Sequence, residues 1–273
     1  MLKTEDDNMD FERRFGGIDR LYGAGALARL AAAHVCVVGI GGVGSWAAEA
    51  LARCGVGRLS LIDLDHIAES NTNRQIHALA GNYGCAKVDA MARRIAAINP
   101  ACQVSAIDDF ITVENVAAVL PDCDAVLDAI DDGRAKAALI AHCRAEGRLV
   151  VTTGGAGGRR DPTRLRVADL ALTEHDPLAA RLRAQLRKEY AFPREAKAAF
   201  GVDCVYSTEA IVRPVLEEGQ NCATEGVARA PQGLNCAGYG SVVMVTASFG
   251  MAAAARVVDR LMLVTTASVQ VGG

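Results

Sequence analysis

Short apolar runs alternate with amphipathic stretches through the amino-terminal half of the chain. The apolar runs predict strands at residues 35–38, 58–62, 104–107, 125–127 and 149–152. Between them, apolar side chains recur at helical spacing, which predicts helices at residues 45–53, 87–98 and 134–144. Because strands that alternate with helices usually form a parallel sheet, we expect an α/β fold with a Rossmann-like sheet flanked by helices on both faces.

The pattern changes after a glycine-rich stretch at residues 153–158. Downstream, we predict a strand at residues 165–168 and helices at residues 177–190 and from 241 to about 263. Residues 192–235 contain prolines and no clear periodicity, so we expect them to be irregular. We therefore divide the chain into a core at residues 13–158, a C-terminal extension at residues 159–265 and a tail at residues 266–273.

Composition narrows the class of protein. The chain has 273 residues, 51% of them hydrophobic, which is typical of a globular protein with a substantial core. A net charge of -3 gives no global signal for nucleic acid, although a local basic patch remains open. None of the nine cysteines forms a C-x-x-C pair, so we expect reduced thiols, no zinc site and a cytoplasmic location.

One uncharged segment, residues 236–255, approaches the length that spans a bilayer. It contains glycines and hydroxyl side chains and lacks the dense Leu, Ile and Phe content of a strong spanning helix. We therefore favour a buried core helix over membrane association through this segment.

A glycine-rich loop directly follows the first predicted strand. Gly39, Gly41, Gly42 and Gly44 lie between that strand and a helix, where unpaired N–H groups and the helix dipole favour an anion such as phosphate. Asp63 ends the next strand, which is the usual place for an acidic residue that binds a ribose hydroxyl. Taken alone, this pattern indicates an NAD-dependent oxidoreductase.

The polar residues that follow favour ATP instead. Asn71, Arg74, Lys87 and Asp131 all follow strands whose carboxyl ends share one edge of the sheet. Hydride transfer needs neither the arginine nor the lysine, whereas a triphosphate with Mg²⁺ needs cations and a carboxylate. Singly, each has an ordinary alternative, because Arg74 and Lys87 could be solvated charges, and Asp131 or Asp132 could cap a helix.

Together these motifs resemble the ThiF/MoeB/HesA superfamily, the fold of ubiquitin-activating enzymes and of bacterial adenylyltransferases. The resemblance rests on residues 39–44, 63–65, 71–75, 87 and 128–131. A narrower resemblance, to the tRNA threonylcarbamoyladenosine dehydratases, rests on residues 14–17, 72–79, 152–158 and 201–205. It implies an enzyme that uses ATP to adenylate the carboxylate of threonylcarbamoyladenosine in tRNA, after which the modified base cyclises.

The resemblance also implies roles for individual residues. It implies a nucleotide contact by Gly41, a ribose contact by Asp63, phosphate contacts by Asn71, Arg74 and Lys87, and binding of the Mg²⁺–ATP end by Asp131. A monovalent cation, a homodimer and a sulphur-transfer partner protein are further expectations. The zinc-binding cysteine pairs of the wider superfamily are missing here.

An arginine that reaches the site from the partner subunit is a second feature of the superfamily. Its position corresponds to Gly17 in this chain. Arg14 or Arg20 could take its place, and the sequence leaves this open.

Two further candidates come from the second half of the chain. Cys204 lies in loop-like, glycine-flanked sequence and is the best candidate for a reactive thiol, with an inert buried thiol as the alternative. Basic residues also cluster there and could contact tRNA phosphates or form a solvated face. They are Arg159, Arg160, Arg164, Arg166, Arg181, Arg183, Arg187 and Lys188.

Three functional hypotheses remain at this point. The first is the tRNA-modifying dehydratase. The second is an adenylyltransferase that activates the C-terminus of a sulphur-carrier protein, which the missing zinc cysteines disfavour. The third is a non-catalytic nucleotide-binding or scaffold protein, which Asp63, Arg74, Lys87 and Asp131 disfavour.

Overall fold

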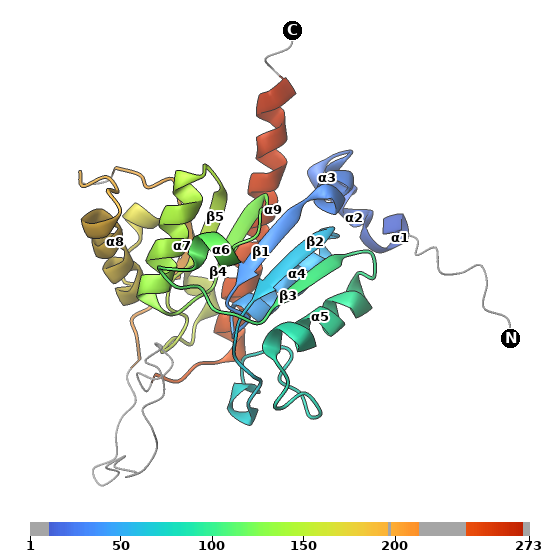
Figure 1. Cartoon of the computed structure of the whole chain (residues 1–273), viewed down its shortest axis with the longest axis horizontal. Helices are drawn as coiled ribbons and strands as arrows, with labels where there is room; N and C mark the ends of the chain where they lie inside the picture. Colours follow the sequence, from blue (N-terminus) through green and yellow to red (C-terminus); the bar gives the residue numbers. More distant parts are fainter. Residues whose placement is uncertain (1–10, 196–197, 213–238, 270–273) are drawn as a thin grey trace, which may run out of the picture.

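The computed structural model describes residues 11–195, 198–212 and 239–269, with side chains described as far as residue 263. Seven strands form one sheet in the order β3-β2-β1-β4-β5-β7-β6 (Figure 1). They are β1 (His34–Val38), β2 (Arg58–Ile62), β3 (Gln103–Ile107), β4 (Ala125–Asp128), β5 (Leu149–Thr153), β6 (Leu165–Asp169) and β7 (Asp203–Ser207). Every pairing is parallel except that of β6 with β7 at one edge.

The helices cover both faces of the sheet, which confirms the predicted fold class. They are α1 (Phe11–Phe15), α2 (Gly17–Tyr22), α3 (Ala26–Ala32), α4 (Gly44–Arg53), α5 (Lys87–Ile98), α6 (Val116–Val119), α7 (Gly133–Ala145), α8 (Pro177–Glu189) and α9 (Val243–Val269). Successive side chains of a strand point to opposite faces, so Val35 and Val37 of β1 join the core under α4, α5 and α9. Cys36 and Val38 join the core under α6, α7 and α8.

Helix α9 lies directly on the sheet and on α4. A side chain at Gly250 would overlap with the Val43 carbonyl oxygen, so the glycine permits close approach of the two helix backbones. Within the described residues, no helix combines the length and hydropathy that crossing a bilayer requires. Of the segment predicted as a core helix, residues 239–255 are described, and α9 buries Phe249 and Ala253.

The second half of the chain differs from the sequence prediction at strand β7 and at the end of helix α9. Strand β7 lies within residues 192–235, which we predicted to be irregular, and pairs with both β5 and β6. A short strand with polar ends carries little periodic signal, and its position between two strands is a long-range property. Helix α9 continues to Val269, beyond the predicted end near residue 263. Strands β6 and β7 belong to the same sheet as the first half of the chain, and α9 packs into the same core.

Candidate nucleotide-binding site

The glycine-rich loop lies at the carboxyl edge of the sheet, where the strand order turns from β1 to β4. Parallel α/β sheets bind ligands in the crevice outside such a point. Gly39 adopts φ +87°, and a Cβ there would lie 2.8 Å from the Ala129 carbonyl oxygen. A Cβ at Gly44 would overlap with the Gly39 carbonyl oxygen, whereas one at Gly41 would meet no atom within 4 Å. The loop is therefore closed against the fold at its ends and open at Gly41.

Asp63 connects the end of β2 to this loop. Its Oδ2 accepts a hydrogen bond from Ile40 N at 2.6 Å, and its Oδ1 accepts one from Asp65 N at 2.9 Å. Lys87, the first residue of α5, is buried and places Nζ 2.6 Å from Asp65 Oδ2 and 3.4 Å from Asp63 Oδ1. The ammonium group is thus held at the carboxyl edge by two carboxylates.

Arg74 approaches the same loop from the segment after β2. A Cβ at Gly42 would lie 3.3 Å from Arg74 Cγ, so the arginine stem occupies the space beside the loop. Its Nη1 donates to Ser70 O at 2.7 Å and to Asn73 Oδ1 at 2.9 Å, while its Nε is buried without a partner among the described residues. Burial lowers the pKa of Arg74 from its ordinary value.

Asn71 shapes the segment that carries Arg74. Asn71 Oδ1 accepts a hydrogen bond from Ala68 N at 2.9 Å, and the Asn71 carbonyl oxygen accepts one from Arg74 N at 3.0 Å. The Arg74 carbonyl oxygen in turn accepts a hydrogen bond from Trp46 Nε1 at 2.9 Å. These contacts fix the Arg74 backbone against α4 and leave its side chain at the crevice.

Asp131 and Asp132 follow β4 and differ in their contacts. The helix-capping alternative applies to Asp132, whose Oδ1 accepts from Arg134 N at 3.0 Å and from Ala135 N at 2.8 Å. The Asp131 carboxylate lies within electrostatic range of Lys87. Partial desolvation raises the pKa of Asp131, while Lys136 and Lys87 act in the opposite direction.

A buried ion pair beneath this turn was not predicted. Lys136 and Asp128 are fully buried, and Lys136 Nζ lies 2.9 Å from Asp128 Oδ2. The same ammonium donates to the Ile130 carbonyl oxygen at 2.9 Å, and Thr152 Oγ1 donates to Asp128 Oδ2 at 2.6 Å. The ammonium therefore sets the path of the backbone that leads to Asp131. A lysine within a run of alanines on an otherwise apolar helix face was the available signal.

Comparison with known proteins identifies the family. The ThiF family model matches residues 17–270. The chain belongs to the ThiF family. It is 52% identical over 254 residues to a tRNA threonylcarbamoyladenosine dehydratase of Escherichia coli, covering 92% of this chain and 94% of that protein. A Haemophilus influenzae protein of the same name is 48% identical, with 93% and 95% covered.

Solved structures agree with this assignment to the ThiF family. The E. coli dehydratase in complex with ATP matches with a TM-score of 0.83 and 47% identity, covering 98% of this chain and all (100%) of that chain. Its complex with AMP matches with a TM-score of 0.83 and 48% identity, covering 96% and 100%.

Cys204 does not lie in a loop, which corrects our expectation for this thiol. It is the second residue of β7, and only 1% of it is exposed. Burial, followed by the nearby Asp176 carboxylate, raises the pKa of the Cys204 thiol well above its ordinary value. A buried, protonated thiol is a poor nucleophile, because the thiolate is the reactive form. Cys222 and Cys236 lie outside the described residues.

We therefore expect Cys204→Ala to change kcat by less than about twofold, since the buried thiol acts as a small apolar side chain. Steady-state turnover and alkylation of the native protein, read by mass spectrometry, would test this. A kcat reduced by orders of magnitude in a folded variant would restore Cys204 as a nucleophile.

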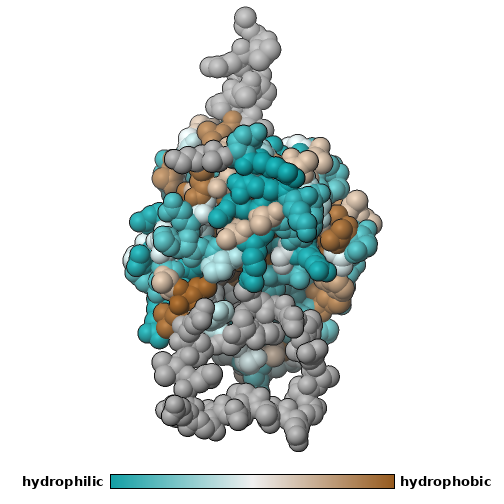
Figure 2. All heavy atoms as spheres, turned by 90° about the vertical axis from the view of Figure 1, so that its left-hand side faces the viewer, coloured by the Kyte–Doolittle hydropathy of each residue, from teal (hydrophilic) through white to brown (hydrophobic). Residues whose placement is uncertain are grey.

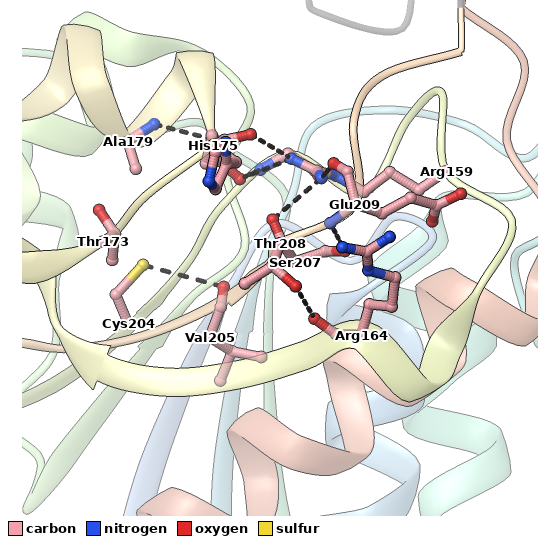
Figure 3. A network of polar contacts seen from close by, with 12 residues as sticks. Arg159, Arg164, Thr173, His175, Ala179, Cys204, Val205, Ser207, Thr208 and Glu209 are labelled. Carbon is pink, nitrogen blue, oxygen red and sulfur yellow. Dashed lines mark hydrogen bonds and ion pairs between the residues drawn. The ribbon is translucent and has the colours of Figure 1, made fainter.

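Arg159 is a structural residue, which corrects its place in the predicted basic cluster. Its guanidinium is fully buried and pairs with the buried Asp176 carboxylate at 3.2 Å. It also donates to the carbonyl oxygen of Gly155 at 2.8 Å. Two further acceptors are the carbonyl oxygens of Ser207, at 3.0 Å, and Glu209, both labelled in Figure 3. Arg160, the next residue, is exposed.

The remaining basic residues divide into two groups. Arg183 donates a hydrogen bond to Thr173 Oγ1, and the Arg187 guanidinium stacks 5.1 Å from the centre of the Phe200 ring. Both side chains are therefore engaged in contacts within the fold. The others are exposed. Arg160 and Arg164 lie just before β6, Arg166 lies in β6, and Arg181 and Lys188 lie in α8.

The amino-terminal arginines lie far from the glycine-rich loop of their own chain. Arg14, in α1, donates to the Ile98 carbonyl oxygen at 3.1 Å, at the end of α5 that leads into β3. Arg14 and Arg20 are exposed. This end of α5 lies at the amino edge of the sheet (Figure 1), so neither arginine reaches the crevice beside the glycine-rich loop of its own chain.

Proposed function

We propose that this protein is an ATP-dependent dehydratase that acts on threonylcarbamoyladenosine in tRNA. The observation that carries the proposal is the crevice in which Asp63, Arg74, Lys87 and Asp131 gather around an open glycine-rich loop. Its support is the match along nearly the whole chain to dehydratases, one of them solved with ATP. We place this activity in the cytoplasm.

The first chemical step overcomes the low reactivity of a carboxylate, whose negative charge repels nucleophiles. A carboxylate oxygen of the modified base attacks the α-phosphorus of ATP and displaces pyrophosphate, which forms an acyl-adenylate. Lys87 and Arg74 stabilise the negative charge that develops on the phosphates, because preorganised cations act strongly in a partly desolvated crevice. Asp63 accepts a hydrogen bond from a ribose hydroxyl, and Asn71 contacts the phosphates.

The second step needs no external nucleophile. A ureido atom of the same modified base attacks the acyl carbon, the ring closes and AMP leaves. The net change is loss of water from the base, coupled to conversion of ATP into AMP and pyrophosphate. Because the attack is intramolecular, proximity supplies much of the rate.

Asp131 is the residue that we expect to hold Mg²⁺ with ATP. Its fit rests on the contacts at this turn, since Asp132 caps α7 and the Asp131 carboxylate lies within electrostatic range of Lys87. Within the described part of the chain, no group of three or more His, Cys, Asp or Glu side chains is arranged to hold a metal ion. Mg²⁺ commonly uses one carboxylate together with substrate phosphates, and it would neutralise phosphate charge.

Release of AMP with different substrates tests the proposed function. We expect the protein to release AMP from ATP with tRNA that carries threonylcarbamoyladenosine, and not with small carrier proteins that end in diglycine. The cyclised nucleoside would be identified by mass spectrometry of the digested tRNA. Release of AMP with a carrier alone would support the adenylyltransferase alternative and overturn the proposal.

The exposed arginines in β6 and in the segment just before it are the proposed contact surface for tRNA phosphates. Strand β6 is the edge strand at the α8 end of the sheet, where the molecule presents a mainly hydrophilic side (Figure 2). We expect Arg160→Glu, Arg164→Glu and Arg166→Glu each to weaken tRNA binding about 3–10-fold at moderate salt, and each to lower the salt dependence by about one counterion. Filter binding at several salt concentrations would measure both.

The matched control is Arg93→Glu, an exposed residue on α5. If this control weakens tRNA binding as much as the β6 variants, the effect is one of net charge, and β6 is not the contact surface.

A homodimer completes the proposal, because the arginines of α1 and α2 lie far from the loop of their own chain. In a dimer, Arg14 or Arg20 would reach the site of the partner. A sulphur-transfer partner protein has less support, since the buried Cys204 offers no accessible thiol. Light scattering, and mixing of Arg14→Ala with Lys87→Met protomers to restore activity, would test the shared site.

A further inference from the structure

The glycine-rich loop is held at Ile40 from both sides. The Ile40 N–H donates to Asp63 Oδ2 at 2.6 Å, and the Ile40 carbonyl oxygen lies 3.0 Å from His77 Nε2. Asp63 was predicted from the sequence, but His77 was noted only as part of a longer motif. Ile40 itself is fully buried, so its position is also fixed by packing.

The hydrogen bond defines the tautomer of His77. A carbonyl oxygen can only accept, so Nε2 must carry the proton. His77 is 1% exposed, and its Nδ1 is buried without a hydrogen-bond partner among the described residues. Burial lowers the pKa of His77, with Lys87 and Arg94 lowering it further against the opposing effects of the Ile40 carbonyl and Asp63. The ring is therefore neutral at pH 7 and acts as a donor through Nε2.

The backbone of His77 is anchored as firmly as its ring. Its carbonyl oxygen accepts hydrogen bonds from Asn82 Nδ2 at 3.0 Å and from Leu79 N at 3.0 Å. It also belongs to the segment that carries Arg74, which Trp46 ties to α4. His77 thus links the segment of Arg74 to the loop that begins at Gly39.

We infer that His77 is a positioning residue for the nucleotide. Its Nε2–H holds the Ile40 carbonyl so that the N–H groups of Gly41 and Gly42 stay directed towards the phosphates of ATP. This inference rests on the proposed function as far as the ligand is concerned. His77 itself touches no reacting atom, so its contribution lies in binding of ATP and not in the chemical step.

His77→Leu removes the donor and keeps a buried side chain of similar size. A buried carbonyl left without its donor costs stability locally and frees the loop, so we expect KM for ATP to rise about 10-fold. Turnover at saturating ATP should stay within about threefold. His77→Gln, whose side-chain amide can donate to the same carbonyl, should recover KM to within about twofold of the natural protein.

Two controls separate positioning from general damage. His142→Leu changes a histidine of α7, on the opposite face of the sheet, and should leave KM for ATP unchanged. Thermal unfolding of each variant reports on folding. His77→Leu with a KM within twofold of the natural protein, or with kcat reduced and KM unchanged, overturns the inference.

Direct measurements keep the inference testable if His77→Leu does not fold. Calorimetry without tRNA should show the same 10-fold loss of affinity for ATP in any folded variant that lacks a side-chain donor at position 77. Nitrogen-15 NMR of the natural protein should show His77 as the neutral Nε2–H tautomer between pH 6 and 8, and an Nδ1–H tautomer overturns the inference. Because neither measurement uses tRNA, a failure of the proposed substrate would not be mistaken for a failure of His77.

Discussion

Replacing Lys87 by methionine should lower kcat/KM about 10²–10³-fold and leave the protein folded. Its ammonium is held between the carboxylates of Asp63 and Asp65 at the edge where the phosphates of ATP are proposed to bind. Methionine keeps the length and apolar stem of lysine and removes only the charge. The loss should fall mainly on kcat, because the charge on the phosphates grows as pyrophosphate leaves.

The stability of this variant distinguishes catalysis from folding. Asp65 is largely exposed, with 76% of its side chain accessible, so water can solvate it once the ammonium is gone. Asp63 retains its hydrogen bonds from Ile40 N and Asp65 N. Arg93→Met, which removes a cation at an exposed position of α5 outside the basic cluster, serves as the control. Equal kcat/KM for Lys87→Met and the natural protein would remove Lys87 from the proposed mechanism.

Local patterns in the sequence were sufficient to predict the nucleotide half of the molecule. Each of the first five strands is a short apolar run, and each polar candidate follows a strand, so parallel pairing alone brings Asp63, Lys87 and Asp131 to one edge. The need for glycine at two loop positions is also local. Gly39 has a positive φ angle, and Gly44 lies too close to the backbone of Gly39 to carry a side chain. The roles of these residues with ATP stay predictions.

Burial of polar groups could not be predicted in the same way. Arg159 is buried because Asp176, Ser207 and Glu209, distant in sequence, converge on it. In the sequence it is indistinguishable from the exposed Arg160. Cys204 looked loop-like because its strand is formed by pairing with β5 and β6, and neither partner is local.

Replacing Arg159 by leucine should destabilise the protein by about 3–5 kcal/mol, the usual cost of leaving one member of a buried ion pair without its partner. Leucine would leave the Asp176 carboxylate without its ion-pair partner. It would also leave the carbonyl oxygens of Ser207 and Glu209 without this donor (Figure 3). For a chain of this size, Tm should fall by roughly 6–20 °C. Urea unfolding followed by circular dichroism would measure the change in free energy.

Arg160→Leu is the matched control, because it makes the same change one residue along at an exposed position, and should cost less than about 0.5 kcal/mol. The comparison of Arg159 with Arg160 also decides how a loss of tRNA binding is interpreted. Val212 N donates to the Gly158 carbonyl oxygen at 2.7 Å, and Gly158 N donates to the Gly240 carbonyl oxygen at 2.7 Å, so the backbone beside Arg159 joins three distant parts of the chain. Loss of tRNA binding in Arg159→Leu would therefore reflect a displaced backbone, whereas loss in Arg160→Glu would reflect a lost charge. Similar stability of the two leucine variants would contradict the structural role of Arg159.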